Sequence, residues 1–220
     1  MRLSFDKLAI FSDFDGTITT EDTLVYLLDK YGTPDWWDIE NRLLQGTIDE
    51  KQALPAEIDT LNVPWEEAIN VLLEYIGIDP GFAEFLKWTE NRKIPFTILS
   101  GGFKEIIGAL LNHHFKNDFN ILANSLEIDD CKWKVIPSEL PKINDLCNNC
   151  KSFPLLEMKK KGYQTVYIGD GSTDRCPSSN ADLVFAKSDL ADYCRENSIE
   201  YHPYSNFSDI LNIMCEIIDR

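Results

Sequence analysis

The sequence is short of positive charge. Its 220 residues include 21 Lys and Arg against 37 Asp and Glu, which gives a formal net charge of −16. Nucleic-acid binding depends on clustered Lys and Arg opposite the phosphates, so this balance argues against a nucleic-acid partner. An anionic small molecule would need a local device to hold it, such as a metal ion, a lysine or the N-terminus of a helix.

Long apolar runs are also missing. No stretch is long enough to span a bilayer, and residues 1–6 lack the apolar core of a secretory signal. We therefore expect a cytoplasmic protein with no membrane partner. In that setting the six cysteines favour reduced thiols. Cys147 and Cys150 form a single CxxC pair, which Cys131 could join as a metal ligand, but a lone pair at this spacing favours ordinary thiols.

Short apolar runs predict buried strands, at residues 7–12, 95–99, 119–123, 164–168 and 182–186. Continuous apolar strands buried on both faces are typical of parallel sheets. Helical patterns lie between the runs, with apolar stripes over residues 103–113, 151–161 and 207–218. This alternation predicts an α/β fold, with a parallel sheet covered by helices on both faces.

Residues 20–80 follow a different pattern. They predict helices over roughly 22–31, 35–45, 49–59 and 64–76, with no convincing strand between them. A helical block between the first and second strands predicts an inserted all-helical cap domain, 20–80, on a core made of 1–19 and 81–220. Such insertions lie where loops gather at the carboxyl ends of the strands.

The first strand ends in an acidic segment, Asp13-Phe14-Asp15-Gly16-Thr17. Alternation along the chain puts Asp13 and Asp15 on the same side. Two carboxylates this close repel each other unless a cation lies between them, and Mg²⁺ prefers oxygen ligands of this kind. Taken alone, the segment has an alternative interpretation as a common acidic Asp-Gly turn.

Three more polar segments follow predicted strands or precede helices. Ser100-Gly101-Gly102 offers a hydroxyl and a helix N-terminus to an anion, although a helix cap with a glycine turn is an alternative. Lys151 precedes a predicted helix and by itself reads as a surface lysine. The segment 169–174 brings two further carboxylates, Asp170 and Asp174, to a strand end.

Together and in this order, the four segments resemble the motifs of the haloacid dehalogenase superfamily of phosphotransferases. The resemblance covers the whole core, and the helical insertion is similar to the cap of the phosphoserine phosphatase branch. It implies a phosphoric monoester hydrolase in which Asp13 is the nucleophile that accepts the phosphoryl group. Asp15 would be the acid and base that protonates the leaving oxygen and then activates water.

The resemblance also implies the binding residues. Ser100, with Gly101, would bind the phosphate, and Lys151 would balance the charge of the phosphoaspartate. The cofactor would be Mg²⁺, held by Asp13, Asp170 and the backbone carbonyl of Asp15. Asp174 would lie outside the metal's ligand shell or contact the lysine.

Finer features bear on the substrate, a small-molecule phosphomonoester. The segments 170–177 and 181–187 are similar to two branches, the methionine-salvage phosphatase of a phosphorylated hydroxy-keto methylthiopentene and the phosphocholine/phosphoethanolamine phosphatases. The Cys147–Lys151 cluster and the segments 34–37 and 201–204 favour the former. A phosphoserine phosphatase is an alternative, weakened by Thr173 where that branch has Asn. A phosphomutase of the same fold is another.

Specificity in a capped enzyme depends on side chains that the cap places over the substrate. Candidates are Glu21, Asp22, Trp36, Trp37 and Arg42. Arg42 could pair with a second anionic group of the substrate, against the plainer interpretation of a solvated helix arginine. The two tryptophans favour a place in the core of the cap. A homodimer is one assembly that the sequence allows.

Overall fold

The computed structural model describes residues 7–141 and 151–218. Within these two ranges, seven strands form one sheet in the order β4-β3-β2-β1-β5-β6-β7. All neighbouring strands pair in parallel except β3 and β4, which are antiparallel. The strands are β1 Leu8–Ser12, β2 Phe96–Phe103, β3 Asn120–Asp129, β4 Lys132–Ile136, β5 Gln164–Gly169, β6 Leu183–Ala186 and β7 His202–Pro203. The predicted α/β class and the parallel sheet are confirmed.

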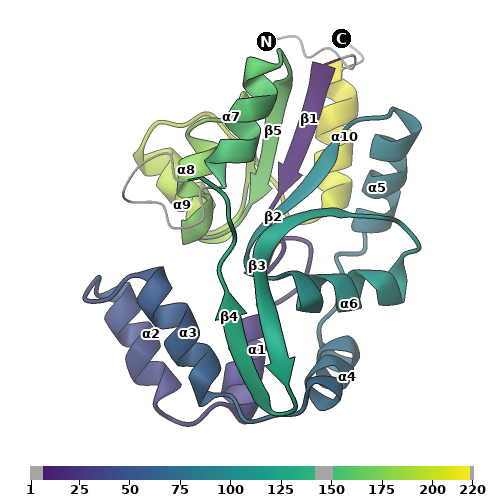
Figure 1. Ribbon diagram of the computed structural model, residues 1–220. Helices are drawn as coiled ribbons and strands as arrows, with labels where there is room; N and C mark the ends of the chain where they lie inside the picture. The colour runs from purple at the N-terminus through teal and green to yellow at the C-terminus, as the bar shows by residue number, and fades with distance from the viewer. Residues whose placement is uncertain (1–6, 142–150, 219–220) are drawn as a thin grey trace.

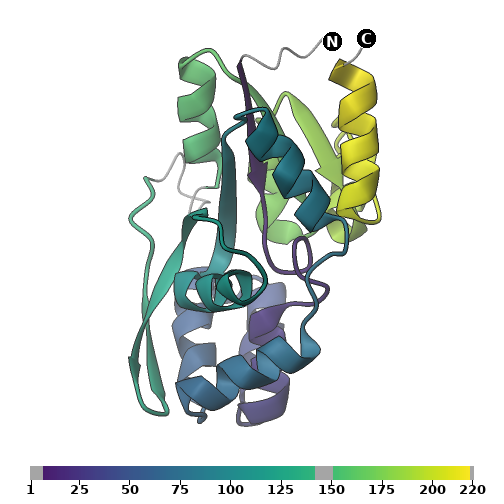
Figure 2. The ribbon, with the colours of Figure 1, turned by 90° about the vertical axis from the view of Figure 1, so that its right-hand side faces the viewer.

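β1 lies at the centre of the sheet, and its side chains alternate between two layers of helices. Leu8 and Ile10 pack into the large apolar cluster that includes α5 (Phe82–Asn91), α6 (Lys104–His114) and α10 (Phe207–Ile218). Ala9 and Phe11 pack on the other face, against α7 (Ser152–Lys160). Figure 2 shows α5 and α10 together on one face of the sheet.

Short helices complete the second half of the chain. They are the 3₁₀ turn η2 (Ser172–Asp174), α8 (Arg175–Ser178) and α9 (Ser188–Glu196). The helices predicted at 103–113, 151–161 and 207–218 correspond to α6, α7 and α10. The sequence interpretation missed α5, α9 and the two-residue strand β7. None of the helices in the described ranges is long and apolar enough to cross a membrane.

Four helices lie beyond the carboxyl ends of the central strands (Figure 1). They are α1 (Thr23–Tyr31), α2 (Trp36–Leu44), α3 (Glu50–Thr60) and α4 (Trp65–Tyr75), each within two residues of its predicted bounds. Capping sets some of these limits. Asp22 caps α1 by accepting from the amide of Val25, and Asp49 and Gln52 form a capping box that begins α3. The assignment of 20–80 to a separate cap domain stays a prediction.

A long hairpin connects the sheet to these helices. β3 continues well past the predicted strand at 119–123, turns at Asp130 with a φ of 54°, and returns as β4. On β4, Trp133 is buried and its ring meets that of Trp65 on α4 edge-on at 5.6 Å. The sequence interpretation missed the hairpin because its residues alternate between buried and exposed, and the apolar run that marks a doubly covered strand ends at residue 123.

The entry and exit of the helical insertion run side by side. Thr19 and Ile78 form an antiparallel bridge, and the amides of Thr20 and Asp79 donate to the carbonyls of Gly77 and Ile18, each at 2.9 Å. Asp79 itself is buried, and its carboxylate holds this paired segment against the core. Its Oδ1 accepts from the amides of Gly81, at 2.8 Å, and Phe207, at 3.1 Å.

We expect Asp79→Ala to destabilise the protein, because it leaves the amides of Gly81 and Phe207 without an acceptor. The loss should be about 1–3 kcal/mol for each amide that stays buried. Urea unfolding measures it. Asp79→Asn is the matched control, since its side-chain carbonyl still accepts and it should lose less. Equal losses for the two variants would contradict this role of Asp79.

Candidate active site

The four polar segments converge at one edge of the sheet. Asp13 directly follows β1, Ser100 lies in the second half of β2, and Asp170 directly follows β5. Lys151 is the N-terminal flanking residue of α7. Because β1 lies between β2 and β5 and pairs with both in parallel, the carboxyl ends of these strands open onto the same place.

A buried lysine joins two carboxylates there. Nζ of Lys151 lies 2.7 Å from Oδ1 of Asp13 and 2.7 Å from Oδ1 of Asp174, and it donates to the Thr173 hydroxyl at 2.9 Å. The lysine side chain is only 5% exposed. Burial alone would lower its pKa, but the two carboxylates outweigh burial and raise the pKa above the ordinary value. The lysine therefore stays charged beside Asp13.

Asp174 is surrounded by donors. Its Oδ1 accepts from the Tyr167 hydroxyl at 2.5 Å as well as from Lys151, and its Oδ2 accepts from the amides of Asp170 and Gly171 at 3.0 and 3.1 Å. The residue is completely buried. With donors on both oxygens, Asp174 orients Lys151 and fixes the turn after β5. This geometry accords with the expected contact between Asp174 and the lysine.

Three carboxylates form a compact acidic cluster. One oxygen each of Asp13, Asp170 and Asp174 all lie within 4.8 Å of one another. Donors occupy both oxygens of Asp174, whereas Lys151 contacts a single oxygen of Asp13 and the Thr17 hydroxyl a single oxygen of Asp170, at 2.7 Å. Asp13 and Asp170 are thus the pair with room for a further ligand. An all-oxygen donor set of this charge fits a hard divalent cation such as Mg²⁺.

Burial and mutual repulsion both act on the cluster. Burial is the larger cause that raises the pKa of Asp13, and the charge of Asp174 adds to it, while Lys151 opposes both. Burial also raises the pKa of Asp170, and the Thr17 hydroxyl opposes the rise. Lys151, together with the Lys187 charge that acts on Asp170, does not neutralise these acids. The site therefore has an excess of negative charge that a bound cation would offset.

Gly16 shapes the turn beneath the cluster. Its φ is +69°, and a Cβ there would come within 2.5 Å of Oδ2 of Asp170. An alanine would therefore be strained in its backbone and would collide with a candidate metal ligand. The glycine of the first motif is needed both for the turn and for the space that Asp170 occupies.

Asp15 lies beside the cluster and is held by the start of α1. Its Oδ1 accepts from the amide and the hydroxyl of Thr23, at 2.9 and 2.6 Å, and its Oδ2 accepts from the Ser100 hydroxyl at 3.4 Å. Burial raises the pKa of Asp15, against the lowering effect of Thr23. The raised pKa favours a carboxyl group that can carry a proton. The structure thus brings Asp15 and Ser100 together, as the sequence predicts.

The Ser100 loop is fixed from the neighbouring strand. The Ser100 hydroxyl accepts from the Gly102 amide at 2.9 Å, and the Asn124 amide group donates to the Gly101 carbonyl at 2.7 Å. Asn124 is buried and also accepts from the amide of Ser138 at 3.0 Å. Sequence reasoning missed Asn124 and Thr23. The signal for Asn124 was present, since it is the polar residue that directly follows the predicted strand 119–123.

A large cleft of about 1370 Å³ opens above these residues, between the sheet edge and the helices α1–α3. From the sheet edge, its walls include Asp13, Asp15, Ser100, Gly101, Asn124, Lys151 and Thr173. From the helices they include Asp22, Trp36, Glu40, Glu50 and Glu57. The size suits a small organic molecule with room to spare.

Asp22 lines this cleft, and its contact with a substrate stays a prediction. Neighbouring protein atoms and the charge of Asp15 raise the pKa of Asp22 to about 7. Arg42 and Trp37 are exposed and are not among the residues that line the cleft. Of the cysteines discussed above, Cys131 is a free thiol, and Cys147 and Cys150 lie outside the described residues.

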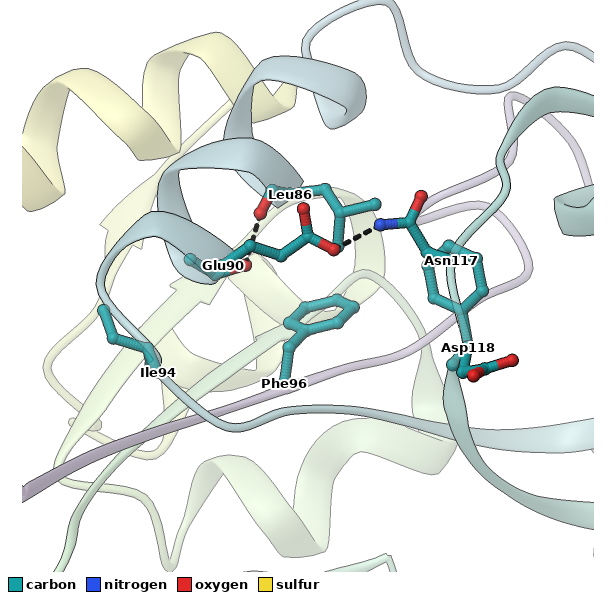
Figure 3. Close-up of a pocket in the computed structure, with 8 residues that line it drawn as sticks. Leu86, Glu90, Ile94, Phe96, Asn117 and Asp118 are labelled. Carbon is teal, nitrogen blue, oxygen red and sulfur yellow. Dashed lines mark hydrogen bonds between the residues drawn. The ribbon is translucent and has the colours of Figure 1, made fainter.

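A second, smaller hollow of about 150 Å³ lies near the amino ends of the strands, away from the cleft (Figure 3). It is bounded by α5 and by the amino ends of β2 and β3, where Phe96, Asn117 and Phe119 line it. Asn117 donates a hydrogen bond to Glu90 across it. None of the four motif segments reaches this hollow.

Comparison with known proteins places this geometry in context. The family model described as haloacid dehalogenase-like hydrolase matches residues 10–176. A polyol phosphate phosphatase of Saccharomyces cerevisiae is 32% identical over 236 aligned positions, which cover 96% of this chain and 94% of the yeast protein. A 2-hydroxy-3-keto-5-methylthiopentenyl-1-phosphate phosphatase of Bacillus cereus is 28% identical over 225 positions, which cover 97% and 98% of the two chains.

A solved structure is similar in fold. The phospho-aspartyl intermediate analogue of a phosphoserine phosphatase superposes with a TM-score of 0.71 at 22% identity, covering 94% of this chain and 98% of that one. At this identity the likeness concerns the fold. It supports the seven-stranded arrangement and the helices placed beyond the sheet edge.

We expect Gly16→Ala to destabilise the protein more than Gly46→Ala. Both glycines have a φ close to +70°, but a Cβ at position 46 meets nothing within 4 Å. Gly46→Ala should lose about 1–2 kcal/mol from backbone strain alone. Gly16→Ala adds the collision with Asp170. Urea unfolding of both variants measures the difference, and equal losses would contradict the steric role of Gly16.

We also expect the stability of the folded protein to depend on the ionisation of Glu57. Burial, and then the charge of Glu40, raise the pKa of Glu57 to about 7 in the folded protein. The folded state therefore binds this proton more tightly than the unfolded chain, and stability falls as the pH rises from the ordinary Glu pKa through 7. Glu57→Gln should unfold about 2–4 °C above the wild type at a pH of about 8, and should show no gain at about pH 4.

Asp59→Asn is the matched control for this measurement. Asp59 lies on the same helix, is exposed and does not line the cleft. It should shift the melting temperature little at either pH. A gain for Glu57→Gln that is the same at both pH values would contradict the burial of an ionisable Glu57.

Proposed function

This chain belongs to the haloacid dehalogenase-like hydrolases, and from that premise we propose that it hydrolyses small phosphomonoesters through an aspartyl-phosphate intermediate on Asp13. The chain is a phosphatase by its relatives, which are named for small-molecule phosphate substrates. The observation that carries the mechanism is the contact of 2.7 Å between the buried Lys151 and Asp13.

Asp13 is the nucleophile. A carboxylate and a dianionic phosphate repel each other, so the attack requires positive charge at the point of contact. Lys151 supplies one such charge and keeps its proton because of Asp13 and Asp174. An oxygen of Asp13 attacks phosphorus, the bond from phosphorus to the leaving oxygen breaks, and the phosphoryl group is then covalently bound to Asp13.

Asp15 moves the proton. Burial raises its pKa, which supports a protonated carboxyl group at the start of the reaction. In the first step Asp15 donates its proton to the leaving oxygen. In the second step the same carboxylate takes a proton from water, whose oxygen attacks phosphorus and breaks the bond to Asp13, releasing inorganic phosphate. Thr23 holds Asp15 in place for both transfers.

Ser100 and Gly101 would receive the phosphate. Ser100 is buried at the sheet edge, and the loop that carries it is fixed by Asn124. Its hydroxyl and the amides of this loop, close to the N-terminus of α6, are suited to phosphate oxygens. A bound Mg²⁺ would supply additional positive charge to the transferring group. Asp13, Asp170 and the Asp15 carbonyl are the oxygens we assign to hold it.

The names of two relatives and the likeness in fold to a third protein suggest three kinds of leaving group. One relative is named for polyol phosphates and another for the hydroxy-keto-methylthiopentenyl phosphate, the preference that the sequence motifs suggest. The likeness in fold to a phosphoserine phosphatase suggests a third kind, in which the leaving group is an amino acid. All three substrates are phosphomonoesters of small molecules, and the mechanism above is common to them.

We expect Asp13→Asn to lower phosphate release from any phosphomonoester substrate by at least about 10³-fold, because the amide is a poor nucleophile. A phosphate-release assay over a panel of monoesters with Mg²⁺ measures this. Asp59→Asn, which removes an exposed charge that does not line the cleft, should retain full activity. Hydrolysis that survives Asp13→Asn would overturn the nucleophile assignment.

The same assay separates the phosphatase from a phosphomutase. A phosphatase releases inorganic phosphate, whereas a mutase returns the phosphoryl group to the substrate at another position. We expect release of one phosphate for each ester consumed. Isomerised ester without free phosphate would support the mutase.

We expect activity to depend on added Mg²⁺. Chelation should abolish phosphate release, and added Mg²⁺ should restore it. Asp170→Asn should raise the Mg²⁺ concentration for half-maximal activity by at least about 10-fold, because the site loses a charged oxygen ligand. Titration of activity with Mg²⁺ at saturating substrate measures this. An unchanged half-maximal concentration would remove Asp170 from the metal site.

A further inference from the structure

Tyr167 on β5 joins the apolar core to the proposed active site. Its ring is completely buried in the cluster that also holds Phe11 of β1 and Leu155 of α7. Its hydroxyl donates to Oδ1 of Asp174 at 2.5 Å. Tyr167 is not among the residues that line the cleft, so it does not touch a substrate there. A phenylalanine would fill the same space in the core, so the contact of the hydroxyl with Asp174 is the feature that needs an explanation.

The hydroxyl of Tyr167 is a donor that keeps its proton. Burial, and then the charges of Asp174 and Asp13, raise the pKa of Tyr167 well above its ordinary value. The phenol therefore donates to Asp174 at any pH near neutrality. A contact of this length between a hydroxyl and a carboxylate is typical of a charge-assisted hydrogen bond. Such a bond offsets part of the negative charge of Asp174.

Lys151 contacts the same oxygen of Asp174. An ammonium group has three N–H donors, and Nζ of Lys151 meets three acceptors among the described residues. Two are Oδ1 of Asp13 and Oδ1 of Asp174, each at 2.7 Å, and the third is the Thr173 hydroxyl at 2.9 Å. The lysine thus lies at the same distance from the proposed nucleophile and from its supporting carboxylate. Because charges are poorly screened in the interior, the charge on Asp174 affects how strongly Lys151 is held at Asp13.

Building on the proposed phosphatase function, we propose that Tyr167 is a positioning residue for phosphoryl transfer: its hydroxyl weakens the attraction of Asp174 for Lys151, so that the lysine keeps its contact with Asp13. Without the hydroxyl, Lys151 would be the one remaining donor to Oδ1 of Asp174 among the described residues, and it would be held closer to Asp174. Asp13 would then lose part of the positive charge that favours its attack on phosphorus and stabilises the phosphoaspartate.

A purely structural role of Tyr167 predicts a different result. In that case the hydroxyl only satisfies a buried carboxylate, and its removal lowers the stability of the fold while the folded enzyme keeps its kcat. Tyr163 provides the matched control. It directly precedes β5, packs against the same apolar cluster and does not line the cleft. It is not one of the donors to Asp174.

The test measures kcat and KM for p-nitrophenyl phosphate at saturating Mg²⁺. The leaving group of this ester needs little protonation, so the rate reports on Lys151 and Asp13 more than on Asp15. Tyr167→Phe removes the hydroxyl and keeps the ring. It should lower kcat about 10-fold without raising KM, a loss of the size expected for one hydrogen bond to a charged group. Tyr163→Phe should keep both values within about 2-fold of the wild type. Urea unfolding checks that each variant is folded at the assay temperature.

The outcomes separate this proposal from the proposed function. If the wild type releases phosphate from none of p-nitrophenyl phosphate, glycerol phosphate and phosphoserine, the phosphatase function fails. If it hydrolyses only one of the other two esters, that ester takes the place of p-nitrophenyl phosphate. If the wild type is active and Tyr167→Phe keeps its kcat, or raises KM instead, the function stands and the role of Tyr167 is wrong. Equal losses of kcat in Tyr167→Phe and Tyr163→Phe would also overturn that role. So would a Tyr167→Phe variant that does not fold, because the hydroxyl would then serve the fold.

Discussion

The site depends on one buried cation between two carboxylates. Lys151 contacts Asp13 and Asp174 at 2.7 Å each, and it is nearly excluded from water. A buried lysine is tolerated only when anions compensate for its lost hydration. The pair of acids meets this need, and the lysine in turn draws the start of α7 to the ends of β1 and β5. Its position orders the rest of the site.

The balance of charge around this lysine explains the chemistry. Four acids of two motifs, Asp13, Asp15, Asp170 and Asp174, lie near the buried Lys151, and Lys187 also acts on Asp170, so the site still favours additional positive charge. Asp174 is saturated with hydrogen bonds and therefore acts as a support. Asp13 and Asp170 are less constrained. Carboxylates of α2 and α3, namely Glu40, Glu50 and Glu57, line the same cleft.

Two of the connections between the helical insertion and the core bear on the site. One is the paired entry and exit of the insertion, with Asp79 tied to α10. The other is the β3–β4 hairpin, whose Trp133 packs against Trp65. The hairpin also carries Asn124 at its base, which fixes the Ser100 loop. The element that reaches the helices thus also shapes the proposed phosphate site.

The sequence by itself determined the class of fold and the residues of the four motifs, because apolar runs and helical stripes are local and the motif residues follow strand ends directly. It also predicted the first and last residues of helices α1–α4 to within two positions. Only the tertiary structure identified the parts played by Thr23 and Asn124, since Thr23 holds Asp15 from 8 positions away and Asn124 holds Gly101 from 23 positions away. The hairpin was missed for a related reason, because its burial comes from contact with α4, which local periodicity does not record.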